Sequence, residues 1–258
     1  MSHADHAKLQ VGFKRAKYHW PAFAGDTFKK KFIIRSLRST SDKRHSIITI
    51  NCQLTNQRGV VVFTCDKSML FPFEVPPSQV EVPSNSDSLG DSFLNHIIDK
   101  SDVLQGLGSQ TLASVRPGQL ILHTLTRPLS ETHSMQLATL ARLTHERHFN
   151  TRLFRREELF IPGGLVLGLT CSLSSRDLHE VLFEEIIECE FPNNLNPADT
   201  VGAVTFVGEL EEHVSGDMEA ITVRTIGIKN CKNHQYIDRP IYIVTCSYHS
   251  CYNVYIIY

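Results

Sequence analysis

Runs of β-type residues dominate the first third of the chain. Three stretches rich in Ile, Val, Thr and Phe alternate in part between apolar and polar positions: 28–37, 45–54 and 60–70. This alternation is typical of half-buried strands. The turn-forming residues Asn56-Gln57-Arg58-Gly59 lie between the last two stretches and predict a long antiparallel hairpin.

No long helical pattern precedes these strands, so region 20–70 is expected to form strands without a central helix of its own. The Pro/Ser-rich segment 72–88 predicts a linker, and apolar residues at helical spacing predict a short helix at 89–98. The apolar face of the strands must then be buried by the second part of the chain, by helix 89–98, or by another subunit.

The second part of the chain, from about residue 111, mixes strand and helix patterns. Ser130 opens a helical pattern, and strands are predicted at 119–125, 181–190, 201–209 and 221–228. Pro162-Gly163-Gly164 precede the apolar run Leu165–Leu169. Because the run is apolar on all sides, it predicts a buried helix from near Gly163 to about Ser174.

The two parts of the chain repeat one motif. The turn that ends in Asp26-Thr27 is echoed by the turn that ends in Asp199-Thr200, and each turn precedes strands. The two aspartates are expected to cap these chain reversals. The second copy has a long stretch of strand and helix before its turn, and the first copy has little of it.

Composition and charge narrow the possible functions. Hydrophobic residues make up 41% and charged residues 21%, with a net charge of -1, so no global charge favours nucleic acid or an anionic membrane. The seven cysteines form no C-x-x-C pair, which argues against a disulfide framework and a structural zinc site. Neither a signal peptide nor a run of ~18 apolar residues is present. We expect a cytoplasmic protein, with mitochondria or another organelle left open, and no metal or cofactor.

Several segments together resemble the MaoC-like acyl-CoA hydratases of the hot-dog fold. Pro21–Thr27 and Asn56–Gly59 resemble the closing half of such a domain, with its P-x-x-x-G-D-T and N-Q-R-G phrases. Leu129–Thr144 resembles the helix before the family's active-site loop, and Gly163–Leu167 resembles the start of its central helix. The arrangement is most similar to double-domain members such as mesaconyl-CoA-type hydratases.

The resemblance implies an α+β hot-dog fold, an antiparallel sheet wrapped around a central helix, with the second repeat whole and the first truncated. It divides the chain into a partial repeat at 1–75, a linker with a short helix at 76–110, a MaoC-like domain at 111–230 and an atypical tail at 231–258. It also implies an acyl-CoA thioester as ligand and a homo-oligomer.

The family's catalytic loop G-D-x-N-P-L-H corresponds here to residues 145–151. Glu146 falls at the motif's Asp, His148 at its Asn, and Thr151 at its catalytic His. Threonine is no base near neutral pH, so this correspondence implies a degenerate site. Gly163 and Gly164 correspond to the start of the helix that polarises the thioester carbonyl.

Each of these residues has a plainer alternative. Glu146 can be a surface carboxylate, His145 and His148 ordinary loop histidines, and the glycine pair a point of close helix packing. Three hypotheses stay open: a weak hydratase or dehydratase, a non-catalytic thioester-binding or assembly protein, and a gene fragment. We expect little hydratase activity with retained binding.

Overall fold

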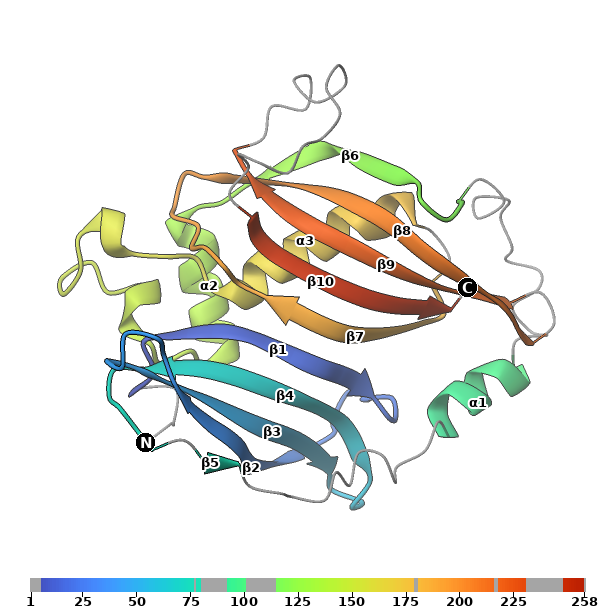
Figure 1. Ribbon diagram of the computed structural model, residues 1–258, viewed down its shortest axis with the longest axis horizontal. Helices are drawn as coiled ribbons and strands as arrows, with labels where there is room; N and C mark the ends of the chain where they lie inside the picture. Colours follow the sequence, from blue (N-terminus) through green and yellow to red (C-terminus); the bar gives the residue numbers. More distant parts are fainter. Residues whose placement is uncertain are drawn as a thin grey trace.

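The computed structural model describes residues 6–76, 78–79, 92–100, 115–178, 181–215, 218–230 and 248–257. Their strands form one antiparallel sheet in the order β5-β2-β3-β4-β1-β7-β10-β9-β8-β6 (Figure 1). The strands are β1 (Leu9–Tyr18), β2 (Phe28–Ser39), β3 (Ser46–Asn56), β4 (Val61–Phe71), β5 (Ser78–Gln79), β6 (Leu120–Pro128), β7 (Phe183–Glu190), β8 (Thr200–Ser215), β9 (Met218–Lys229) and β10 (Tyr248–Ile257). The helices are α1 (Ser92–Lys100), α2 (Glu131–Ala141) and α3 (Gly163–Asp177), with short 3₁₀ turns at Glu146–His148 and Arg156–Glu158.

The sheet divides into two halves with the same strand order. In the first half, β2 pairs with β3, β3 with β4, and β4 with β1. In the second half, β8 pairs with β9, β9 with β10, and β10 with β7. The predicted repeat therefore extends to four strands per copy. The sequence pattern predicted neither β1 nor β10, and β10 lies within 231–258, the segment expected to be an atypical tail.

Strands β1 and β7 join the halves along one antiparallel seam, where Phe13 pairs with Cys189 and Ala16 with Ile186. Gly12 is required at this seam, since a Cβ there would collide with the carbonyl oxygen of Cys189. Ion pairs Lys14–Glu188 and Lys17–Glu185 add charge complementarity along the same line.

Helix α3 is the central helix of the second half. It runs behind β8, β9 and β10 in Figure 1 and packs against them and β6. Val166, Thr170 and Leu173 are almost fully buried, and Leu167 and Cys171 pack against a cluster that includes Cys189 and Val223. The prediction of a buried helix beginning at Gly163 is confirmed, and the helix continues three residues beyond Ser174.

The two aspartate turns are built alike. Asp26 accepts hydrogen bonds from the Phe23 N–H (2.9 Å) and the Gln57 side-chain amide (2.7 Å), whose oxygen accepts from the Thr27 N–H. These bonds from Phe23 and Gln57 hold the pKa of Asp26 below its usual value.

At the second turn, Asp199 accepts from the Asn196 N–H (2.7 Å) and the Asn230 amide (2.9 Å), and Asn230 accepts from the Thr200 N–H. Burial raises the pKa of Asp199, but Lys229 and these hydrogen bonds outweigh it, and the net shift is downward. The predicted capping role agrees with the contacts at both positions.

The inner face of the sheet, defined as the side on which Cys189 contacts the α3 cluster, differs between the halves. Paired residues in antiparallel strands share a face, so Phe13 of β1, Lys67 of β4 and Ile50 of β3 lie on the same side as Cys189. Ile34 pairs with Ile50, and Ile34 is 47% exposed. Within the described residues, no helix packs against this face of β2–β4, and α2 and the start of α3 face part of it across a cavity.

Helix α1 packs elsewhere. Its apolar residues Phe93, Leu94, Ile97 and Ile98 contact Phe183 of β7 and Ala220 of β9. It therefore leaves the inner face of the first half open. Within the described part of the chain, no helix is long and apolar enough to cross a membrane.

Candidate functional site

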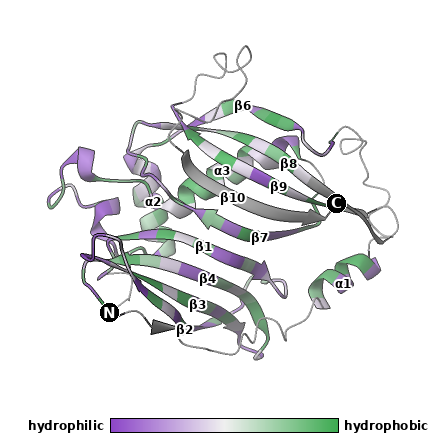
Figure 2. Cartoon of the chain, viewed as in Figure 1, coloured by the Kyte–Doolittle hydropathy of each residue, from purple (hydrophilic) through white to green (hydrophobic). Residues whose placement is uncertain are grey.

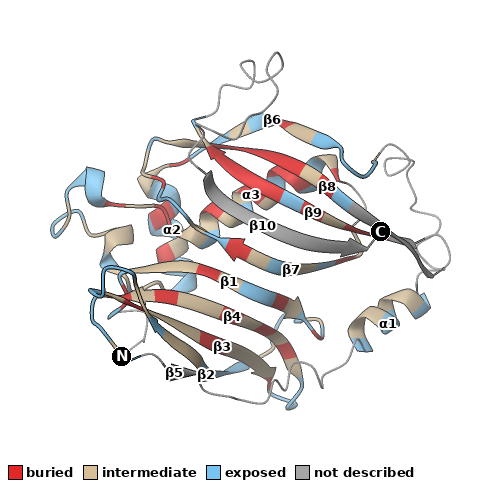
Figure 3. Cartoon of the chain, in the orientation of Figure 1, coloured by how far each residue is buried: buried red, intermediate tan, exposed pale blue. Residues whose placement is uncertain are grey.

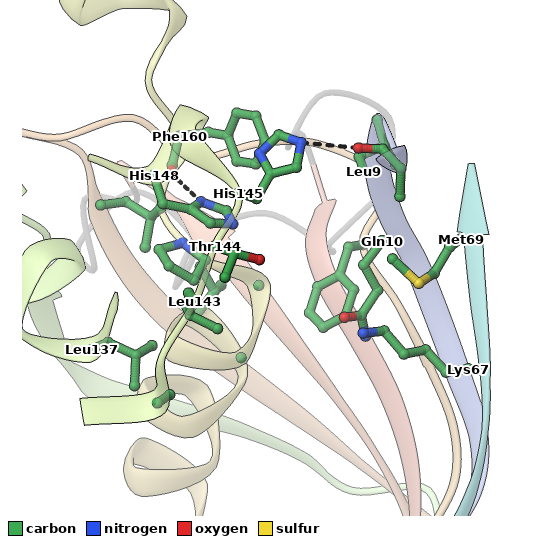
Figure 4. A pocket seen from close by; sticks show the side chains of 18 of the residues that line it. Leu9, Gln10, Lys67, Met69, Leu137, Leu143, Thr144, His145, His148 and Phe160 are labelled. Carbon is green, nitrogen blue, oxygen red and sulfur yellow. Dashed lines mark hydrogen bonds between the residues drawn. The ribbon is translucent and has the colours of Figure 1, made fainter. Parts of the chain in front are cut away.

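A cavity of about 570 Å³ lies where the first half meets the start of α3 (Figure 4). One wall comes from β1, β2, β3 and β4, and the other from α2, the following loop and α3. We call it the α3 cavity. Its lining includes Lys8, Gln10, Lys30, Cys52, Lys67, Met69, Arg142, Thr144, His145, His148, Phe160, Gly163, Gly164 and Phe191.

The amino end of α3 opens into this cavity. Pro162 is the N-cap residue and supplies no side-chain cap, while its carbonyl accepts from the N–H groups of Leu165 and Val166. The N–H groups of Gly163 and Gly164 are therefore without an intrahelical partner. Together with the positive end of the helix dipole, they favour an oxygen atom that carries negative charge.

The two glycines have different reasons to be glycine. A Cβ on Gly163 would lie 3.1 to 3.2 Å from the ring of Phe191, which is tight packing. A Cβ on Gly164 would meet nothing within 4 Å. Gly163 therefore allows close packing of the helix against Phe191, and Gly164 leaves open space at the helix start.

His148 lines the α3 cavity, and a hydrogen bond defines which of its ring nitrogens carries the proton. Its Nδ1 lies 3.0 Å from the Phe160 carbonyl oxygen. A carbonyl only accepts, so Nδ1 carries the proton and Nε2 keeps its lone pair. Burial lowers the pKa of His148, and the Phe160 carbonyl opposes that shift. Figure 4 shows the second ring nitrogen turned from Phe160 toward the space beside Thr144.

His145 stands beside His148, with ring centroids 5.5 Å apart. Its Nε2 lies 2.9 Å from the carbonyl oxygen of Ala7, so Nε2 is the protonated nitrogen by the same argument. Its Nδ1 is buried and has no hydrogen-bond partner in the described structure. His145 thereby ties the loop after α2 to the start of β1.

The structure brings three of the five sequence-predicted site residues together: His148, Gly163 and Gly164 all line the α3 cavity. Glu146 begins the 3₁₀ turn, is exposed, and is not among the residues that line it. Thr151 lies in the exposed turn that follows and does not line it either. The functional assignment of all five residues stays a proposal.

The positively charged residues on the wall of the α3 cavity were not predicted from the sequence. Lys8, Lys30, Lys67 and Arg142 line it, and no Asp or Glu is among its described lining residues. Lys30 and Lys67 come from two separate strands and Lys8 precedes β1, so no local motif in the sequence indicates them. Burial lowers the pKa of Lys67, and the charge of Lys30 adds to that shift.

Two other polar clusters in the described residues have their side chains hydrogen-bonded within the cluster. Buried His123 of β6 uses Nδ1 with Asp177 (2.6 Å) and Nε2 with Thr205 (2.7 Å), so neither ring nitrogen is free for chemistry. Asp66 is held by Asn51 and Arg15. In the same part of the chain no group of three His, Cys, Asp or Glu side chains could hold a metal ion.

Sequence comparison finds no relative: no protein-family model matches the chain, and no curated protein matches it. Solved structures do match. A MaoC domain protein dehydratase from Chloroflexus aurantiacus is 21% identical with a TM-score of 0.77, over 98% of this chain and 76% of that one.

A double hot-dog protein of Mycobacterium tuberculosis is 13% identical with a TM-score of 0.70, over the same shares of both chains, 98% and 76%. The peroxisomal multifunctional enzyme type 2 of Drosophila melanogaster is 10% identical with a TM-score of 0.53, over 96% of this chain and 37% of that one. These similarities establish the fold. The chain has the mixed α+β hot-dog fold that the sequence predicted.

Proposed function

We propose that this protein is a hydratase-type hot-dog protein that binds a short acyl thioester in the α3 cavity and turns it over weakly. The observation that carries the proposal is the composition of the cavity. It combines the open start of α3 with a neutral histidine, and no carboxylate is among its described lining residues. The dehydratase descriptions of several similar solved structures support the hydratase-type label.

The start of α3 suits a thioester carbonyl. The N–H groups of Gly163 and Gly164 point along the helix axis toward the ligand side, as the first N–H groups of any helix do. When a nucleophile adds to an enoyl thioester, negative charge builds on the carbonyl oxygen. Donors that already stand in place stabilise that charge without reorganisation.

His148 suits the role of base. Hydration of an enoyl thioester takes a proton from water, adds the hydroxyl to Cβ and places a proton on Cα. The Nε2 lone pair of neutral His148 can accept the first proton, and the resulting imidazolium can release it to Cα. Water therefore supplies both parts of the product, and the histidine ends as it began.

Weak turnover follows from what surrounds that base. The resemblance assigns the family's acid–base pair to positions 146 and 151, and neither Glu146 nor Thr151 lines the α3 cavity. One misplaced acid–base group typically removes on the order of 10²–10⁴ in rate. Binding through backbone N–H groups and apolar walls does not require it.

The test is a parallel measurement of binding and hydration with crotonyl-CoA. We expect a thermal upshift of the protein by the thioester, and hydration, followed by loss of enoyl absorbance, well below that of ordinary hydratases. His148→Gln should abolish the remaining hydration and keep the upshift, since Gln can still donate to the Phe160 carbonyl. Absence of any upshift would overturn the binding proposal, and ordinary hydratase rates would overturn the weak turnover.

Thr151→His tests the correspondence with the family's loop. The structure leaves Thr151 exposed and outside the lining of the cavity, so we expect no gain in hydration. A gain of about tenfold or more, roughly one unit of log rate, would show that position 151 reaches the ligand. It would then favour the pairing of Glu146 and a restored histidine.

We also propose a homo-oligomer in the cytoplasm. Phe28, Phe32 and Ile34 of β2 are 38, 46 and 47% exposed on a face that also carries Lys30, and exposed apolar side chains grouped in this way are commonly buried between subunits. Light scattering across a concentration range tests it, and a monomer at all concentrations would contradict it.

A further inference from the structure

The α3 cavity carries unbalanced positive charge. Among its lining residues, Lys30, Lys67 and Arg142 have no hydrogen-bond or ion-pair partner for their side chains in the described part of the chain. Lys8 is engaged with His45. No carboxylate is among the described lining residues, and the acidic groups that act on Lys67 are the thiols of Cys52 and Cys65.

Lys67 is the most informative of these cations, because it is half-buried. Its strand neighbours on the inner face are Phe13 and Ile50, both apolar. A lysine is rarely held in such surroundings unless its charge is paired. In Figure 4 its side chain reaches from β4 toward Gln10, on the wall opposite His148. An ammonium group in this position lacks an anion.

Lys30 reinforces the same wall. It lies on β2, and its charge makes a minor contribution to the lowered pKa of Lys67, which is caused chiefly by burial and opposed by Cys52 and Cys65. Both ammonium groups line the α3 cavity from the same face of the sheet, so a single anion can interact with both. Neither side chain has another described role.

Arg142 faces this space from the other wall. Its backbone lies in the left-handed region (φ 50°) at the C-cap of α2, where glycine or asparagine is favoured. A long cationic side chain therefore occupies a strained position at the edge of the cavity. Its guanidinium can add a planar pair of donors to a carboxylate or phosphate.

We infer that Lys67 and Lys30, with Arg142 opposite, form an anion subsite that receives an oxyanion group of the ligand whose thioester lies at the start of α3. The cavity volume of about 570 Å³ is in the range of small-ligand sites. The oxyanion is either a carboxylate at the end of the acyl chain or a phosphate of the thioester's carrier. The thioester end of this ligand rests on the proposed function, and the anion subsite stands on its own contacts.

The experiment measures binding by titration calorimetry on the full chain with matched ligands. Butyryl and succinyl thioesters of N-acetylcysteamine differ by a terminal carboxylate and have no phosphate. Butyryl-CoA adds the phosphates. Inorganic phosphate alone is the fourth probe. Proteins are the wild type, Lys67→Met, Lys67→Arg and the control Lys29→Met, whose side chain lies on the other face of β2, next to Lys30 in sequence.

We expect an anionic ligand to bind about tenfold more tightly than its neutral match, as a charge-assisted hydrogen bond provides. Lys67→Met should remove that preference, and Lys67→Arg and Lys29→Met should keep it. A preference for succinyl over butyryl identifies the carboxylate as the source. A preference only for butyryl-CoA identifies the phosphate.

Equal affinity for charged and neutral ligands in the wild type, or a preference that survives Lys67→Met, would overturn the subsite. If no thioester binds while phosphate binds in a Lys67-dependent manner, the subsite stands and the proposed thioester function falls. If no probe binds to any protein, both are wrong. Circular dichroism on each variant separates loss of binding from loss of fold.

Discussion

The two halves of the sheet share a topology and differ in what covers them. Both place four strands in the same order, and in both a turn built around an aspartate precedes the second strand in sequence, β2 or β8. In the second half α3 packs on the inner face, and Figure 3 shows buried residues concentrated in β8 and β9. The strands of the first half are mostly of intermediate burial in the same view.

The two halves agree in secondary structure and differ in tertiary packing. Strand order and turns follow from local pattern and hydrogen bonding, and both halves achieve them. A dry core needs a second layer, which α3 supplies to one half only. Figure 2 shows hydrophobic colour in α3 and β8 and mixed colour along β1–β4. The half without a helix therefore provides the polar, cationic wall of the α3 cavity.

The largest expected difference concerns side chains on the two inner faces. Leu173 of α3 is 1% exposed and Phe32 of β2 is 46% exposed. Leu173→Ala should lower the free energy of unfolding by about 2–5 kcal/mol, because it leaves a cavity in a packed core. Phe32→Ala should cost about 1 kcal/mol, since half of the ring already contacts water. Urea denaturation measures both.

An equal cost for the two substitutions would show that the face around Phe32 is covered in solution. That result would favour the proposed homo-oligomer. Dilution of the protein before denaturation then distinguishes cover by a second copy from cover within the chain, because only the former depends on protein concentration.

The two aspartate turns give the next largest difference. Asp199 has an ion pair with Lys229 at 2.7 Å, and the nearest cation to Asp26 is Arg58 at 3.9 Å. Asp199→Asn should cost about 1 kcal/mol of unfolding free energy, after screening by solvent. Asp26→Asn should cost less. Thermal unfolding at low and high salt tests this order, and a larger loss at Asp26 would contradict it.

Asp199 also predicts a pH effect with a definite sign. Its folded pKa is below the usual value of 3.8, so the unfolded chain takes up the proton first as pH falls. Its stabilisation is present above that pH and is lost as pH falls through the folded pKa. Asp199→Asn should therefore flatten the decline of stability below about pH 4, measured against the wild type.

Substitution of the two glycines at the start of α3 should give smaller effects of opposite sign. Gly164→Ala should stabilise the helix by about 0.5–1 kcal/mol, because its Cβ meets nothing within 4 Å. The same methyl group should weaken thioester binding. Gly163→Ala should destabilise by about 1 kcal/mol, since the Phe191 ring also packs against Phe13. Equal effects at both positions would contradict the division of roles.

His148 should give the smallest effect. Burial holds its folded pKa below 6.5, so between these two values the unfolded chain binds more protons than the folded one. Stability should therefore decrease as pH falls below about 6.5, and His148→Gln should lessen that decrease. Denaturation at pH 7.5 and 5.5, compared between wild type and variant, measures it. An unchanged slope would show that the ring is solvated.

Several elements were predictable because their causes are local. The strands of 28–70 follow from alternation, the central helix from an apolar run after Pro162-Gly163-Gly164, and the aspartate caps from turn chemistry. Strand β1 was not predicted, because Leu9–Tyr18 carries three basic residues and only one β-branched residue. Its strand conformation depends on partners on both sides, β4 and β7.

The candidate site was predictable in part for the same reason. His148, Gly163 and Gly164 belong to one continuous segment that resembles a known family, and such a segment can be compared with the family's motif position by position. Lys30 and Lys67 belong to separate strands, and each is an ordinary lysine in its own sequence context. Their charges meet only when β2, β3 and β4 stand side by side.

The sequence alone therefore determined the central helix and the repeated turn, since hydrophobic period and turn residues act over a few neighbours in the chain, and its resemblance to a known family implied the fold class. The tertiary structure decided which half received the helix layer, that Glu146 and Thr151 stay outside the α3 cavity, and that unpaired cations line it. These properties depend on burial and on charges brought together across long sequence separations, and no local pattern encodes the distance between two strands.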